Sequence, residues 1–327
     1  MNAVDALAAG TPGPSATIRR NQILDVIARS LTRAAAILVL VMLGGVIVAL
    51  IDGSMPAIRA FGLGFITTEK WNPVTEVFGA AAPIYGTLVT SFIALLIGVP
   101  LSIGIAIFLT ELCPRQLKRP LGIAIELLAG IPSIIYGIWG LFVLAPLLQE
   151  YVQPALIAIF EPIPVLSGLF AGPPYGIGVL TAGLILSIMI LPFVTSITRD
   201  VFDTVPPMLK ESAYGLGCTT WEVVWNVVLP YTRTGVIGGI MLGLGRALGE
   251  TMAVTFVIGN AHRIAESLLA PGTTISASIA NEFTEADGEL YTSSLVTLGL
   301  ILFLITFIVL AAARLMLLRM KRAEGKK

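Results

Sequence analysis

Six long apolar stretches constrain this chain more than any other feature of its sequence. The first covers residues 34–51, which hold no polar side chain. Their number is close to what an α-helix needs to cross a hydrocarbon core of about 30 Å. Five more stretches predict further spans, at about residues 87–110, 121–148, 176–198, 234–258 and 290–313. The sequence therefore predicts an all-α membrane protein with about six transmembrane helices.

The composition agrees with membrane insertion. Only 12% of the residues are charged and 56% are hydrophobic, whereas soluble domains carry about 25% charged residues. The net charge is zero, so we expect no nucleic-acid partner. Two cysteines and one histidine, His262, are too few for a zinc site. We therefore expect no metal in this chain and interpret His262 as an ordinary loop residue.

The lysines and arginines predict the orientation. Sixteen of them fall in the N-terminal segment, the second–third and fourth–fifth connections and the C-terminal tail, and three fall on the other side. Because cytoplasmic segments carry the excess of basic residues, both termini are predicted to be cytoplasmic. We divide the chain into a partly disordered N-terminal tail (1–33), a transmembrane domain (34–318) with a polar connection at 203–230, and a basic tail (319–327).

The two longest outer connections are predicted to be loops. Residues 149–175 are rich in proline, and residues 259–289 are acidic. Glu126 lies near the cytoplasmic end of the third predicted span, where its side chain can reach the membrane surface. We interpret Glu126 as structural.

The polar connection has the pattern of two helices joined by a glycine turn. Asp203 or Thr204 can cap a helix that starts at residues 206–207, because proline is tolerated in a first turn. Gly215 and Gly217 are predicted to end this helix. Residues 219–222 form a capping box that opens a second short helix, and Pro230 is predicted to end it.

The same connection resembles a known signature. Its matching residues are Glu211, Ser212, Ala213, Gly217, Leu229 and Pro230. Their spacing is similar to the Glu-Ala-Ala, three residues, Gly, nine residues, Ile-x-Leu-Pro pattern of permease subunits of ABC importers. Ser212 replaces the first alanine of that pattern, and Val227 replaces its isoleucine. The resemblance implies a coupling helix that docks into a cleft on an ATP-hydrolysing subunit, and the alternative is a surface helical hairpin.

Two charges lie inside the fifth apolar stretch. Arg246 is thirteen residues after Arg233, or about 20 Å along a helix, and a charge at that depth costs about 2.5–3.5 kcal/mol. Glu250 follows at i+4, where the two side chains can pair. One interpretation is a structural salt bridge. The other is an anion path lined by Arg246, whose planar fork suits oxyanions, with Glu250 holding the guanidinium in place.

The resemblance extends to the permeases of phosphate importers, in particular the PstC type. It rests on residues 101–111, 122–137, 245–254 and 275–283 and spans roughly residues 30–320. It implies a non-catalytic permease subunit in a bacterial inner membrane. Its implied partners are a related PstA-type permease, two PstB-type ATPase subunits and a periplasmic phosphate-binding protein. ATP and Mg²⁺ would be bound by the ATPase partner, so this chain is expected to hold no cofactor.

Other functions stay open at this point. One is a permease for another oxyanion such as sulfate or molybdate, and another is a stand-alone secondary transporter in which Arg246 and Glu250 couple ions. A membrane enzyme is disfavoured, since the sequence has no Gly-x-x-x-x-Gly-Lys-[Ser/Thr] loop and no His-Glu-x-x-His motif. A Ser–His pair would have to use the single histidine, His262.

Overall fold

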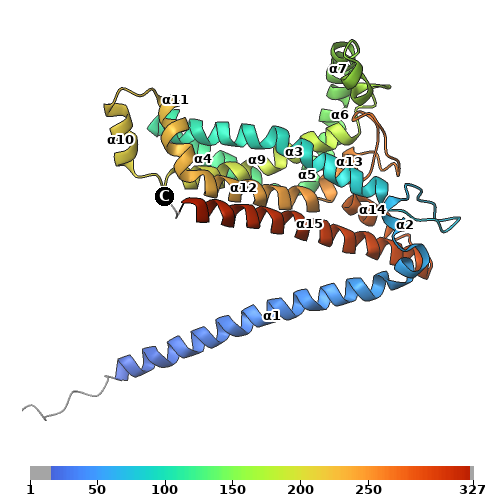
Figure 1. Cartoon of the computed structure of the whole chain (residues 1–327), viewed down its shortest axis with the longest axis horizontal. Helices are drawn as coiled ribbons and strands as arrows, with labels where there is room; N and C mark the ends of the chain where they lie inside the picture. The colour runs from blue at the N-terminus through green and yellow to red at the C-terminus, as the bar shows by residue number, and fades with distance from the viewer. Residues whose placement is uncertain (1–15, 325–327) are drawn as a thin grey trace, which may run out of the picture. The chain divides into compact units, whose positions relative to one another are not determined.

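The computed structural model describes residues 16–324, which are helical apart from their connections and an isolated bridge between Asn72 and Val77 (Figure 1). The disordered start predicted for the N-terminal tail and the last residues of the basic tail fall outside this range. Internal contacts divide the chain into two units, residues 1–52 and residues 53–327. The helices are α1 (Ala16–Phe61), α2 (Gly64–Thr67), α3 (Ala81–Ile107), η1 (Phe108–Leu112), α4 (Arg115–Ala129), α5 (Ser133–Trp139), η2 (Gly140–Leu144), α6 (Ala145–Leu147), η3 (Leu148–Val152), α7 (Gln153–Phe160), α8 (Pro164–Ser167), η4 (Gly168–Phe170), α9 (Val179–Phe202), α10 (Pro207–Gly215), α11 (Thr220–Val223), η5 (Val224–Val228), α12 (Leu229–Gly249), α13 (Met252–Val257), α14 (Ile275–Glu282) and α15 (Glu289–Glu324).

The described residues contain six helical segments that are long and apolar enough to cross a membrane. This confirms the predicted fold class and number of spans. The segments are Asn21–Phe61, Ala81–Leu112, Ser133–Phe160, Val179–Phe202, Thr220–Gly249 and Glu289–Arg319.

The third predicted span, 121–148, is wrong in its boundaries. Residues 115–129 form the separate helix α4, and the spanning segment begins only at Ser133. Pro132 explains the break, because it has an extended backbone (φ −56°, ψ 138°) and disfavours helical geometry in the residue before it. Glu126 therefore lies on α4, where its carboxylate pairs with Arg199 at 2.7 Å.

The fifth predicted span, 234–258, is also wrong at both ends. The helical segment begins at Thr220 and ends at Gly249. Glu250 then takes an extended backbone (φ −70°, ψ 129°), and the short helix α13 starts at Met252. Helices α12 and α13 are both apolar, so hydropathy alone does not reveal the break between them.

The two outer connections are more helical than the loops that we predicted. Residues 149–160 continue the third span through η3 and α7, and α8 and η4 follow. The second connection contains α14, whose first turn, from Ile275 to Ser278, is buried against the bundle. Proline at the start of α7 and α8 is compatible with a helix, because the first turn needs no N–H from that position.

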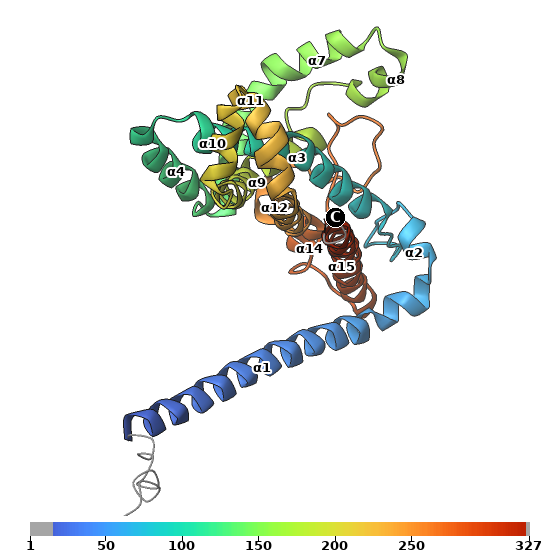
Figure 2. The ribbon, with the colours of Figure 1, turned by 60° about the vertical axis from the view of Figure 1, so that its left-hand side comes forward.

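Helices α3, α9 and α12 lie side by side in the core of the second unit (Figures 1 and 2). Glycines of α12 make close contact with α9 possible. A Cβ atom added at Gly235, Gly239 or Gly243 would lie 2.5 to 3.0 Å from side-chain atoms of α9. Small residues allow helix backbones to approach closely in membranes. The absence of side chains at these three positions therefore lets α12 pack directly against α9.

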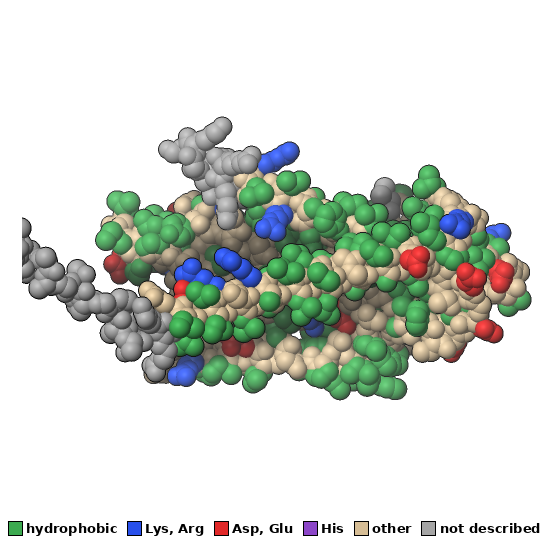
Figure 3. Space-filling model, turned by 90° about the horizontal axis from the view of Figure 1, so that it is seen from below, with side chains coloured by type: hydrophobic (Ala, Val, Ile, Leu, Met, Phe, Trp, Pro, Cys, Tyr) green, Lys and Arg blue, Asp and Glu red, His purple; other side chains and the backbone are tan. Residues whose placement is uncertain are grey.

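Several acidic side chains lie together at the right-hand end of Figure 3. This is the end of the bundle that carries α2, α14 and the start of α15 (Figure 1), and we call it the α14 end. One carboxylate there is partly buried: Glu282 accepts hydrogen bonds from Trp71 Nε1 (2.6 Å), His262 Nε2 (2.6 Å) and the Tyr291 hydroxyl (2.7 Å). His262 also stacks on Trp71, with ring centroids 5.0 Å apart. His262 lies in a loop, as interpreted, but it is not an ordinary loop residue, because its ring joins this partly buried network.

This network favours the charged form of the carboxylate. Burial by itself raises the pKa of Glu282, but the hydrogen bonds from His262, Tyr291 and Trp71 outweigh it, so the pKa lies below its usual value. A carboxyl group with a lowered folded-state pKa stabilises the fold above its unfolded pKa. This stabilisation is lost as the pH falls through the folded value.

We predict that Glu282→Gln lowers the free energy of unfolding by about 1–3 kcal/mol at neutral pH, because three partly buried donors lose a charged acceptor. Thermal melting of the detergent-solubilised protein measures this loss. The difference from wild type should shrink as the pH falls below the ordinary range of a glutamate, because the lowered pKa of Glu282 means that the folded wild-type carboxylate is protonated only there. The exposed neighbour Glu285, changed to Gln, is the control and should melt like wild type. An equal difference at all pH values would contradict the assignment.

Candidate coupling surface and anion path

Helix α10 begins without a side-chain cap. Its N-cap is Pro206, and no side chain accepts a hydrogen bond from its first turn. Asp203 instead ends α9 and pairs with Lys118 (3.2 Å), while the Thr204 hydroxyl donates back to the carbonyl of Val201 (2.6 Å). The predicted cap by Asp203 or Thr204 is therefore wrong. Both residues still belong to the end of α9, too far from the first turn of α10.

Gly217 ends α10 in the predicted way. Its φ of +87° lies in the left-handed region, which side chains disfavour and glycine tolerates. The Gly217 N–H donates to the carbonyl of Tyr214 (2.9 Å), and the Cys218 N–H donates to the carbonyl of Ala213 (3.2 Å). These two bonds form a Schellman motif, which satisfies carbonyls that the helix end would leave free.

The predicted capping box opens α11. The Thr219 N–H donates to Glu222 Oε2 (2.7 Å), and the Glu222 N–H donates to Thr219 Oγ1 (3.4 Å). Pro230, however, does not end this helix. The π-helical turn η5 leads directly into α12, and Pro230 lies in the first turn of α12. The i→i+5 bonds of a π-helical turn shift the hydrogen-bond register, so the missing N–H of the proline falls where it is tolerated.

Helix α10 is anchored on one side and exposed on the other. Lys210 pairs with the buried carboxylate of Glu111 at 2.6 Å, and Ala213 packs against an apolar cluster formed by α3, α9 and η5. The opposite surface is open to solvent, and we call it the α10 face. It consists of the exposed residues Met208, Glu211, Ser212, Tyr214 and Leu216.

The signature residues therefore divide into two groups. Glu211 and Ser212 belong to the α10 face. Ala213 and the half-buried Leu229 contact the same apolar cluster, Gly217 makes the turn, and Pro230 is exposed at the start of α12. The α10 face is therefore an exposed surface that is rich in apolar side chains.

Arg246 lies in the last turn of α12. Its guanidinium sits over the ring of Phe193 on α9, 4.4 Å from the centroid, a distance at which a cation and an aromatic face attract each other. The Nε atom is buried and has no hydrogen-bond partner among the described residues. A buried donor without a partner is rare in proteins, so this group is available to an acceptor.

Arg246 and Glu250 form no ion pair in the part of the chain that the structure describes, so the predicted pairing is wrong. Because α12 ends at Gly249, Glu250 no longer has the i+4 geometry of a helix. Its carboxylate instead accepts from the Ala253 N–H at 3.4 Å. Glu250 thus caps α13 and fixes the break beside Arg246.

Two contacts in the second unit could not be predicted from the sequence. Phe193 is one aromatic residue in an apolar span, and its position under Arg246 depends on how α9 packs against α12. The ion pair of Arg199 with Glu126 joins residues 73 positions apart. Neither partner could be chosen by spacing alone.

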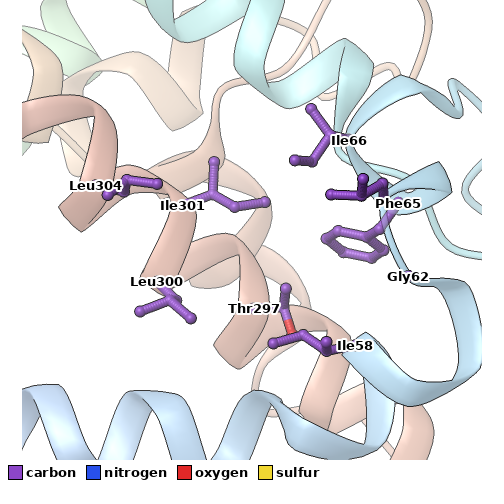
Figure 4. Close-up of a pocket in the computed structure, with 9 residues that line it drawn as sticks. Ile58, Gly62, Phe65, Ile66, Thr297, Leu300, Ile301 and Leu304 are labelled. Carbon is purple, nitrogen blue, oxygen red and sulfur yellow. The ribbon is translucent and has the colours of Figure 1, made fainter. Parts of the chain in front are cut away.

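The apolar pocket in Figure 4 does not suit an anion. It has a volume of about 310 Å³ and is lined by Ile58, Phe65, Leu300 and other apolar residues. The hydroxyl of Thr297 is its one polar side chain, and it donates to the carbonyl of Ser293 (2.7 Å). The pocket presents no charged group.

Comparisons with known proteins agree with this arrangement. Residues 98–322 match the family described as binding-protein-dependent transport system inner membrane component. A protein from Mesorhizobium japonicum named phosphate transport system permease protein PstC is 70% identical, covering 99% of this chain and 100% of that protein. A protein of the same name from Pasteurella multocida is 60% identical, covering 94% of this chain and 96% of its own.

Solved structures support the fold. The chain resembles a bacterial ABC transporter involved in the import of the acidic polysaccharide alginate, with a TM-score of 0.59 and 16% identity, over 93% of this chain and 99% of that one. It also resembles the MetNI methionine ABC transporter, with a TM-score of 0.53 and 15% identity, over 76% of this chain and 98% of that one. The protein belongs to the binding-protein-dependent transport system inner membrane component family, the permease subunits of ABC importers.

Proposed function

We propose that this chain is the permease subunit of an ATP-driven importer that carries inorganic phosphate into the cytoplasm. The observation that carries the substrate is the 70% identity, over 99% of the chain, to a protein named as a phosphate transport permease. We further propose that the chain is the non-catalytic translocation subunit and that it lies in a bacterial inner membrane with both termini in the cytoplasm.

The proposed partners follow the same relationship. They are a related PstA-type permease subunit, two PstB-type ATPase subunits and a periplasmic phosphate-binding protein. ATP and Mg²⁺ would bind to the ATPase subunits, whose conformational change would reach this chain through the α10 face. The anchors of α10 support this role. Lys210 pairs with the carboxylate of Glu111, whose side chain is only 7% exposed. A displacement of α10 would therefore also displace η1, the helical turn that carries Glu111 and precedes α4.

Arg246 is proposed to contact the passing anion. Its guanidinium can offer paired donors to a phosphate oxygen, and its buried Nε has no partner of its own among the residues described. Phe193 would keep the side chain in place by stacking. Glu250 would act on the path by fixing the break between α12 and α13, rather than by pairing with Arg246.

Uptake of radiolabelled phosphate, with sulfate and molybdate as competitors, tests the substrate. A phosphate importer should ignore both competitors. Inhibition by either at concentrations similar to that of phosphate would favour the other-oxyanion alternative. Uptake that persists when no ATPase subunit is present would instead favour a secondary transporter.

The first prediction concerns orientation. Reporter domains fused after Lys327 and inserted within residues 259–289 should lie on opposite sides of the membrane, because the basic residues cluster on the side of the termini. Accessibility of each reporter to a membrane-impermeant reagent gives the answer. Finding both on one side would refute the six-span arrangement.

The second prediction concerns coupling. Met208→Glu and Leu216→Glu place a charge on side chains that are 74% and 86% exposed, so the fold should tolerate them. We expect about tenfold less copurification of the ATPase subunit, a loss typical of an interface hot spot. Val74→Glu, at a position 92% exposed near the α14 end, is the matched control and should keep the ATPase. Equal copurification of the ATPase subunit with all three variants would show that the α10 face is not part of the interface with that subunit.

The third prediction concerns Arg246. Arg246→Lys keeps the charge but loses the planar fork and the stacking surface, so phosphate uptake per inserted molecule should fall by about tenfold. Glu250→Gln should have a smaller effect, because an amide oxygen can still accept from the Ala253 N–H. Arg314→Lys, on the exposed side of α15, controls for the general effect of the substitution. Normal uptake by Arg246→Lys would leave Arg246 with a purely structural role.

A further inference from the structure

The end of the bundle opposite the α14 end holds a charged pocket that the transport function does not use. It lies between α4 and the last turn of α9 and has a volume of about 540 Å³. Four basic side chains line it, Arg115, Lys118 and Arg119 from α4 and Arg199 from α9. Gly122 leaves room for the Arg199 guanidinium, because a Cβ atom there would lie 2.8 Å from it.

Two of these cations are neutralised by acids of the same pocket. Arg199 pairs with Glu126 (2.7 Å) and with Asp200 (2.9 Å). Lys118 pairs with Asp203 (3.2 Å). These pairs use every acidic side chain that lines the pocket.

Arg115 and Arg119 are left over. Both are exposed, and neither has an ion-pair partner among the described residues. Four residues apart on α4, they lie one helical turn from each other on the same side. The pocket therefore presents two adjacent guanidinium groups that have no ion-pair partner of their own, and its lining has one more basic than acidic side chain.

The opposite side of α4 is apolar. Leu117, Leu121 and Leu128 are 50%, 38% and 40% exposed, and helical periodicity places them on one face, away from Arg115 and Arg119. No other helix of this chain covers that face in the described structure. A helix with one basic and one exposed leucine face is typical of the boundary between lipid headgroups and acyl chains.

We propose that the α4 pocket binds the phosphate headgroup of an anionic phospholipid. Two guanidinium forks one turn apart can hold a phosphodiester by paired hydrogen bonds, and the leucine face would contact the acyl chains of the same leaflet. A lipid matches both faces of α4, whereas a free anion matches only one. The two arginines would select a lipid with net negative charge, such as phosphatidylglycerol, over zwitterionic phosphatidylcholine.

The test uses the full-length chain reconstituted in phosphatidylcholine vesicles that contain spin-labelled phosphatidylglycerol or spin-labelled phosphatidylcholine. The wild type should bind the labelled phosphatidylglycerol preferentially. The double variant Arg115→Gln with Arg119→Gln should lose at least about fivefold of this preference, the effect expected for one basic residue near an anionic surface. The matched control Arg314→Gln should keep it.

A second measurement separates a lipid from a free anion and does not depend on a variant. Phosphatidylglycerol with a photoreactive headgroup should crosslink to peptides of residues 115–129 in the wild type. Millimolar inorganic phosphate, present before illumination, should not lower the yield of this crosslink. Displacement by phosphate, absence of this crosslink, or an unchanged lipid preference in the double Gln variant would overturn the proposal.

Discussion

The hydrocarbon core contains no water to hydrogen-bond a free backbone group, and each interruption of a helix in this protein has to meet that constraint. At several of these interruptions, other groups of the chain form hydrogen bonds with the backbone groups that the helix leaves free. At the end of α12, the carboxylate of Glu250 accepts from the Ala253 N–H. After α4, the Gly130 N–H donates back to the carbonyl of Leu127. At Pro230, a π-helical turn shifts the register instead of ending the helix.

The same constraint explains how charged residues are distributed. Two basic side chains near one bundle end are paired with acids: Lys210 with Glu111, and Arg199 with Glu126. A buried polar group without a partner is costly, and the buried Nε atom of Arg246 has no hydrogen-bond partner among the described residues, so its position needs another explanation. Stacking on Phe193 offsets part of the cost, and a passing anion would supply the missing acceptor. This makes Arg246 the most informative position in the spans for the proposed function.

Helix α10 is held by its neighbours on one side and exposed on the other, and this combination suits the coupling role that we propose for it. The Schellman turn at Gly217 and the capping box at Thr219 fix the two helix ends that face each other across the turn. The Lys210–Glu111 pair ties the helix to the end of α3 through η1. A partner that moves the α10 face would therefore move the spans behind it, because little of the motion can be absorbed locally.

The sequence by itself determined the features that depend on local chemistry. Six spans follow from apolar length, the glycine turn from the need for a positive φ at Gly217, and the capping box from Thr219 and Glu222. The signature residues were identified by spacing, which also predicted the family. The break at Pro132 also has a local cause, the proline itself. Hydropathy did not indicate this break, because the residues on both sides of it are apolar.

Only the tertiary structure decided which distant side chains meet. Spacing predicted a pair between Arg246 and Glu250, yet the end of α12 at Gly249 separated them and placed Arg246 over Phe193 on another helix. His262 was a single histidine in a polar connection until packing brought Trp71, Glu282 and Tyr291 around it. Such contacts join segments far apart in the chain and leave no periodic pattern. Their partners are fixed by how helices pack, and packing depends on the shapes of all the side chains together.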